Sequence, residues 1–125
     1  MLTSRRFWDG IGGLAYAFAK ADGAIAEEEM QTFANRVEEA FRAIPTNFPH
    51  RAEAVLQLFH AMSYTPEQAY QEALQHLASV REEVRHYRFD ILDTFRSVIA
   101  ADGRVHPYEA EFLEKLDKDL QRITE

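Results

Sequence analysis

The sequence predicts an all-α fold, a single domain over residues 1–125 built as a bundle of about six helices. The first observation is periodicity: apolar residues recur in steps of three and four and almost never alternate, so no segment requires a strand. The second is size, because 125 residues with 46% hydrophobic content can bury a core within one domain. The third is an internal repeat around two Asp-Gly pairs, which indicates a duplicated helical hairpin.

Each of the first three helices is predicted by an apolar stripe on one helical face. The stripes are Phe7, Ile11, Leu14 and Phe18 for the first helix, Met30, Phe33, Val37, Phe41 and Ile44 for the second, and Ala52, Val55, Phe59 and Met62 for the third. The stretch IPTNFP at residues 44–49 contains two prolines and an asparagine, so it interrupts the helical pattern between the second and third stripes.

The fourth helix has a well-defined predicted start. Thr65 can cap it, with Pro66 in the first turn and Gln68 completing a capping box. Its stripe continues through Tyr70, Leu74 and Leu77.

The fifth helix, at about residues 85–100, is apolar over a wide arc, which predicts a central position with contacts on several sides. This arc comprises Tyr87, Phe89, Ile91, Leu92, Phe95, Val98 and Ile99. The sixth helix begins at Pro107, and its stripe is Leu113, Leu116, Leu120 and Ile123.

The repeat consists of AKADGAIAEEEM at residues 19–30 and IAADGRVHPYEA at residues 99–110. Glycine ends a helix readily because it adopts the left-handed conformation, and the early Glu of each copy can bond to a free N–H of the next helix. We therefore expect residues 5–41 and 85–121 to form two helical hairpins that superpose, with inserted helices at about residues 50–80.

Together with the helical insert LFHAMSYTPEQAYQEAL, these stretches resemble the TerB-like domain, named for a tellurite-resistance protein. They are also similar to the TerB-like region of DjlA-type membrane-anchored DnaJ proteins. The resemblance covers nearly the whole chain and implies an all-α bundle, no known catalysis, and a metal held by acidic motif residues. By match to the motif those residues are Asp22, Glu29, Asp102 and Glu109. These 125 residues contain no J domain, so co-chaperone activity and membrane anchoring are not expected.

Two interpretations of the four motif carboxylates remain open. They are ordinary helix-cap and turn residues, or they hold a cation. Asp22 and Asp102 are predicted at helix C-termini, where the helix dipole disfavours a negative charge by about 0.3–1 kcal/mol. A shared cation would offset this cost, as would hydrogen bonds from the turn. An all-oxygen set favours calcium or magnesium, provided that the two turns converge, which the sequence leaves open.

Composition excludes several classes of function. With 21 Asp and Glu against 14 Lys and Arg, the net charge of −7 would repel a phosphate backbone, so no nucleic-acid partner is expected. The absence of cysteine excludes disulfides and thiolate sites and favours the cytoplasm. The longest apolar run near the start, GIGGLAYAFA, is far shorter than the roughly 20 residues of a membrane span.

Other motifs are weaker. The Asp-Gly stretches resemble half of an EF-hand loop, but the earlier ligand positions would fall on side chains such as Phe18 and Val98. GIGGLA matches a dinucleotide-binding pattern, yet no strand precedes it, so close helix packing explains its small residues better. Glu83 and His86 form one Glu-x-x-His pair without a second copy. The other four histidines lack the spacing of metal ligands: His50, His60, His76 and His106.

Two function classes follow, and neither is enzymatic, because no nucleophile and base can be paired from the chain. The first is a stress-linked module that binds a divalent metal. The second is a metal-independent protein-binding adaptor whose motif only shapes helical hairpins. Either would act on a protein partner through a surface, and aromatic side chains usually dominate such contacts. Trp8, Phe48 and Tyr64 lie off the main stripes, so we expect some of them to be exposed.

Overall fold

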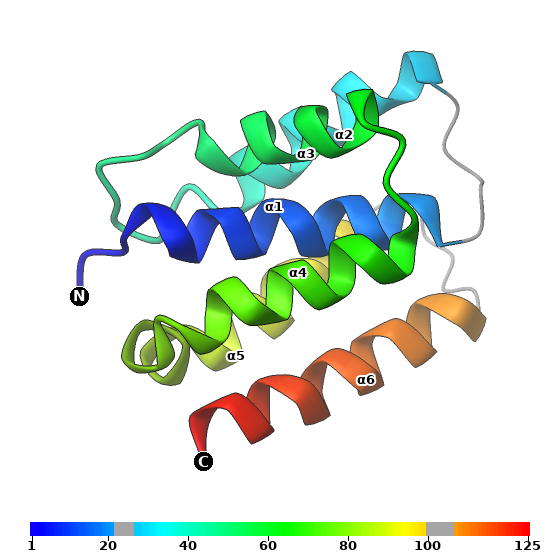
Figure 1. Ribbon diagram of the computed structural model, residues 1–125. Helices are drawn as coiled ribbons and strands as arrows, with labels where there is room; N and C mark the ends of the chain where they lie inside the picture. Colours follow the sequence, from blue (N-terminus) through cyan, green and yellow to red (C-terminus); the bar gives the residue numbers. More distant parts are fainter. Residues whose placement is uncertain (22–26, 100–106) are drawn as a thin grey trace.

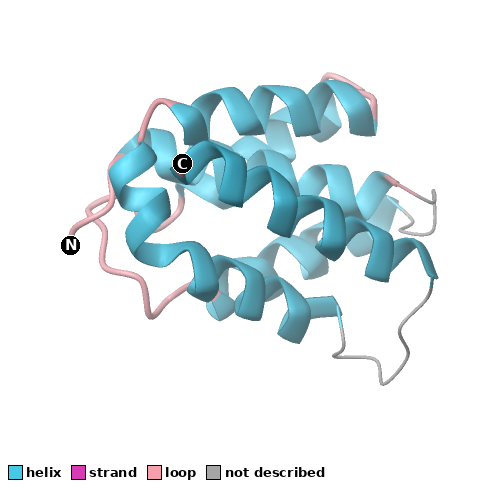
Figure 2. Ribbon diagram, turned by 90° about the horizontal axis from the view of Figure 1, so that it is seen from below, coloured by secondary structure: helices cyan, strands magenta, loops and turns pink. Residues whose placement is uncertain are grey.

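Six α-helices build the structure, a computed structural model that describes residues 1–21, 27–99 and 107–125. They are α1 (Arg5–Lys20), α2 (Glu27–Ala40), α3 (Arg51–Ala61), α4 (Pro66–Ala78), α5 (Arg81–Ile99) and α6 (Pro107–Thr124). Figure 2 shows helices joined by loops, and the described residues contain no strand beyond an isolated bridge between Thr3 and Thr46. The all-α prediction is confirmed. None of the described helices is both long enough and apolar enough to cross a bilayer.

Helix α1 is the central element, and the prediction that the fifth helix occupies this place is wrong. Every residue from Phe7 to Ala19 is buried, and α1 packs most extensively against α4 and α3 (Figure 1). Small residues allow this approach: a Cβ on Gly12 would lie 2.5 Å from the carbonyl oxygen of Ala52 in α3. The GIGGLA stretch therefore serves close helix packing, as its sequence context predicts.

Helix α5 lies on one side of the bundle, packed mainly against α6. It begins earlier than predicted, at Arg81, and Phe89 is 69% exposed rather than part of a wide buried arc. The guanidinium of Arg88 lies 4.8 Å from the centroid of the Phe89 ring and covers part of it. Without Phe89, the buried residues form a narrower stripe, which comprises Val84, Tyr87, Ile91, Leu92, Phe95, Val98 and Ile99.

Helix α4 begins as predicted, with Thr65 and Gln68 in a reciprocal capping box and Pro66 in the first turn. A polar contact joins this helix to α6. The hydroxyl of Tyr70 donates to Asp119 Oδ2 at 2.5 Å, and Lys115 Nζ donates to the same oxygen at 3.0 Å. Burial and the neighbouring Asp119 raise the pKa of Tyr70. Burial works against ionisation of Asp119, but the Tyr70 and Lys115 hydrogen bonds outweigh it and lower the pKa of Asp119.

The N-terminal segment and the loop between α2 and α3 are tied together over Trp8. Thr3 donates its backbone N–H and its hydroxyl to the carbonyl oxygen of Pro45, at 2.9 and 2.7 Å. Trp8 Nε1 donates to Thr3 Oγ1 at 2.8 Å, and the Trp8 side chain is buried. Some of Trp8, Phe48 and Tyr64 were expected to be exposed, and Phe48 is exposed whereas Trp8 is buried. Tyr64 is half-buried, and its ring stacks on that of Phe59 with the two centroids 4.5 Å apart.

The order of the helices follows the proposed duplication. Residues 5–41 contain α1 and α2, residues 85–121 contain most of α5 and α6, and α3 and α4 lie within residues 50–80. The superposition of the two hairpins stays a prediction.

Candidate functional site

The helix ends that flank the two motif copies lie at one end of the bundle. Figure 1 shows the end of α1 and the starts of α2 and α6 on the same side of the molecule. An aromatic cluster joins them: the Phe18 ring centroid lies 6.0 Å from that of Phe33, 6.0 Å from that of Tyr108 and 5.4 Å from that of Phe112. Three helices that border the motif copies therefore share a common contact.

The four predicted ligands have different placements. Asp22 and Asp102 lie outside the described residues. Glu29 is in the first turns of α2 and is exposed. Glu109 is in the first turn of α6 and is 3% exposed, and its Oε2 has no hydrogen-bond partner within the part of the chain that the structure describes. The two Glu residues occupy equivalent motif positions but differ in environment.

A buried carboxylate of this kind has an energetic consequence. Removing an ionised carboxylate from water costs several kcal/mol unless a counter-charge or hydrogen-bond donors offset it. A cation bound at Glu109 Oε2 would provide that counter-charge. Glu109 is therefore the motif residue whose described environment bears most directly on metal binding.

A second cluster of ligand-type side chains lies between α2 and α3. Glu38, His50 and Glu53 each offer one oxygen or nitrogen atom, and these atoms all lie within 4.8 Å of one another. His50 Nδ1 lies 2.9 Å from Glu38 Oε1. It is the one group of three potential ligands among the side chains that the structure describes.

Sequence analysis missed this cluster because its members come from two helices. Glu38 is near the end of α2, His50 directly precedes α3, and Glu53 is in the first turn of α3. The loop that contains IPTNFP brings α3 back alongside α2. The spacing of His50 and Glu53, three residues apart at a helix start, was a usable signal, since it places both side chains on one helical turn.

Neighbouring contacts fix the position of this cluster. Gln31 Nε2 donates to Glu53 Oε1 at 2.7 Å, and Gln57 Nε2 donates to Gln31 Oε1 at 2.8 Å. At the start of α3, Arg51 Nε donates to Asp9 Oδ1 of α1 at 2.5 Å, and the Asp9 side chain is only 8% exposed. The ion pair holds the beginning of α3 against the central helix, next to His50.

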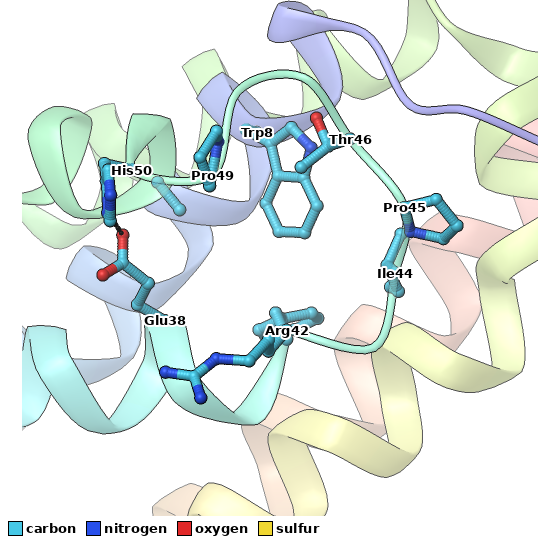
Figure 3. A pocket seen from close by; sticks show the side chains of 10 residues that line it. Trp8, Glu38, Arg42, Ile44, Pro45, Thr46, Pro49 and His50 are labelled. Atoms are coloured by element: carbon cyan, nitrogen blue, oxygen red, sulfur yellow. Dashed lines mark hydrogen bonds and ion pairs between the residues drawn. The ribbon is translucent and has the colours of Figure 1, made fainter.

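A cleft of about 280 Å³ adjoins the cluster. Figure 3 shows the indole of Trp8 between Glu38 and His50 on one side and Ile44 and Pro45 on the other. The complete lining is Trp8, Glu38, Phe41, Arg42, Ile44, Pro45, Thr46, Pro49, His50 and Ala52. The cleft therefore combines apolar side chains with a polar edge that includes Glu38, His50 and Arg42.

The chain matches the model of a known family. The model of a family described as tellurite resistance protein TerB matches residues 10–121, which is nearly the whole chain. No curated protein and no solved structure matches the chain significantly.

Proposed function

The chain belongs to the tellurite resistance protein TerB family, and we propose that it is a non-enzymatic module that binds a divalent cation through its duplicated motif. The description of the family in terms of tellurite resistance supports a role in a stress response. We propose a cytoplasmic location, which agrees with the cysteine-free composition. The module acts on a protein partner.

In this proposal Asp22, Glu29, Asp102 and Glu109 supply the metal ligands. Four carboxylates form an all-oxygen set, which suits a hard cation such as calcium or magnesium better than a soft metal. The stacking of Tyr108 on Phe18 supports the closeness of the two motif copies, since Tyr108 directly precedes Glu109 and Phe18 lies four residues before Asp22.

The burial of Glu109 is the observation that carries the proposal. Its side chain is 3% exposed, and its Oε2 lacks a hydrogen-bond partner among the residues with a described position. A cation at this oxygen would offset the cost of burying the charge. Glu29, which is exposed, would complete the coordination from the solvent side.

Calorimetric titration with calcium and with magnesium tests this role. Glu109→Gln keeps the shape of the side chain but removes its charge, so we expect the affinity to fall by at least about tenfold. Glu111→Gln is the matched control, because Glu111 is an exposed residue of the same helix and should leave the affinity unchanged. Equal affinities for the two variants would remove Glu109 from the ligand set.

A second candidate function is a metal-independent adaptor that binds a protein. It is favoured by apolar side chains that are exposed on α3 and just beyond its two ends: Phe48 at 40%, Leu58 at 52% and Met62 at 51%. This candidate predicts that EDTA leaves the melting temperature unchanged, whereas the metal-binding function predicts that EDTA lowers it.

A further inference from the structure

We infer that Glu38, His50 and Glu53 form a second cation site, one that takes zinc rather than calcium or magnesium. This site is separate from the proposed motif site. Figure 1 shows the end of α2 and the start of α3 at the opposite end of the bundle from the end of α1 and the start of α6. The proposal goes beyond the motif carboxylates and does not depend on them.

The three side chains would fit a small ion if their donor atoms moved slightly closer together. Zinc binds imidazole nitrogen and carboxylate oxygen at about 2.0–2.2 Å, which places ligand atoms about 3.3–3.6 Å apart around a tetrahedral ion. The three donor atoms here lie within 4.8 Å of one another, and Glu38 Oε1 and His50 Nδ1 are already 2.9 Å apart. Rotation of partly exposed side chains covers the remaining difference.

The chemistry of the donors selects the metal. One imidazole nitrogen with two carboxylate oxygens is a mixed nitrogen and oxygen set, which suits zinc, whereas calcium and magnesium prefer oxygen alone. Three protein ligands also leave a fourth position for water or another small ligand. Glu38 and His50 line the adjoining cleft of about 280 Å³, which provides room for that ligand (Figure 3).

The three candidate ligands can be reached from solvent, and neighbouring contacts already hold some of them in place without an ion. The His50 side chain is 80% exposed and that of Glu38 is 23% exposed, so an ion can reach both from solvent. Glu53 is held by the amide of Gln31, the kind of contact that orients a metal ligand from outside the coordination sphere. Zinc would replace the hydrogen bond between His50 and Glu38, with the neutral His50 ring binding through Nδ1 in the tautomer that carries its hydrogen on Nε2.

Zinc titration of the full chain in competition with a chromophoric chelator tests the site. We expect one zinc equivalent with a dissociation constant in the micromolar range for the wild type. His50→Gln, Glu38→Gln and Glu53→Gln should each weaken zinc binding by at least about tenfold, since each removes one of three ligands. Melting in EDTA checks that each variant folds, and these surface substitutions should leave that melting temperature nearly unchanged.

Two matched controls and one motif variant test whether zinc binds at Glu38, His50 and Glu53 rather than elsewhere on the protein. His86→Gln removes an exposed histidine from α5, and Glu39→Gln removes the exposed carboxylate next to Glu38; both should bind zinc like the wild type. The Asp22→Asn/Asp102→Asn double variant should also keep the zinc affinity. The inference is overturned if the wild type binds no zinc, if His50→Gln binds it as tightly as the wild type, or if only the double variant loses it.

Discussion

The Phe18 ring at the end of α1 stacks on the Tyr108 ring at the start of α6, with centroids 6.0 Å apart and planes inclined by 20°. This contact links a helix near the beginning of the chain to one near its end. It also lies one residue from the buried Glu109. The helices α1 and α6, which border the two motif copies, therefore meet through an aromatic contact directly beside the buried Glu109.

Phe18→Ala should destabilise the fold by about 3–5 kcal/mol, because it removes a buried ring that contacts α2 and α6 and leaves a cavity. Urea denaturation measures the change. Phe89→Ala is the control, since Phe89 is 69% exposed and its removal should alter the stability by less than about 1 kcal/mol. Similar losses for both variants would contradict the assigned burial.

Gly12→Ala should destabilise the bundle by about 1–3 kcal/mol, although alanine is the better helix former. The added Cβ would meet the Ala52 carbonyl oxygen at 2.5 Å, and backbone cannot move aside as a flexible side chain can. Thermal unfolding of Gly12→Ala beside Ser97→Ala, an exposed position in α5, measures the effect. A stabilised Gly12→Ala variant would contradict the close packing of α1 on α3.

Thr65→Ala should cost about 1 kcal/mol of unfolding free energy, because the Thr65 hydroxyl accepts the N–H of Gln68 at 3.1 Å and so caps α4. Chemical denaturation measures it. Thr32→Ala, at an exposed position inside α2, should not destabilise the protein. Equal effects at the two positions would argue against the capping box.

Asp119→Asn should destabilise the protein at neutral pH by about 1–2 kcal/mol, because it weakens the acceptor for Tyr70 and Lys115. Since the pKa of Asp119 is lowered in the fold, its ionised form stabilises the protein above the ordinary pKa of about 3.9. That contribution is lost as pH falls below this value through the lowered pKa, so the difference between wild type and variant should shrink in acid. Denaturation across pH 3–7 checks this, with the exposed Asp117→Asn as control. A difference that stays constant with pH would contradict the ionised contact.

The sequence predicts features that depend on neighbouring residues better than it predicts which helices pack against one another. The start of α4 follows from Thr65, Pro66 and Gln68, because capping depends only on neighbouring residues. The central position of α1 was missed, since glycine and alanine between its large side chains add little to an apolar stripe yet permit packing on every side. Phe89 was assigned to the core because periodicity registers an apolar residue but not whether another helix covers it.

For the candidate sites, too, the sequence predicts motif positions but not burial or contacts between helices. The repeat predicts equivalent roles for Glu29 and Glu109, yet Glu29 is exposed and Glu109 is buried, and their helices α2 and α6 pack against different sets of helices. His50 acquires Glu38 as a neighbour only when the loop between α2 and α3 folds back. Motif positions can thus be found in the sequence, whereas burial and contacts between separate helices require the structure.

The melting temperature of the metal-free protein, measured with added calcium, magnesium, manganese or EDTA, tests the motif site most directly. A cation that binds only the folded state raises stability by mass action, by about 2.7 kcal/mol at a concentration one hundred times the dissociation constant. We predict that calcium or magnesium raises the melting temperature of the wild type and of His50→Gln, and that Asp22→Asn/Asp102→Asn loses this rise. A wild type that melts at the same temperature in every condition, or a double variant that keeps the full rise, would contradict metal binding by the duplicated motif.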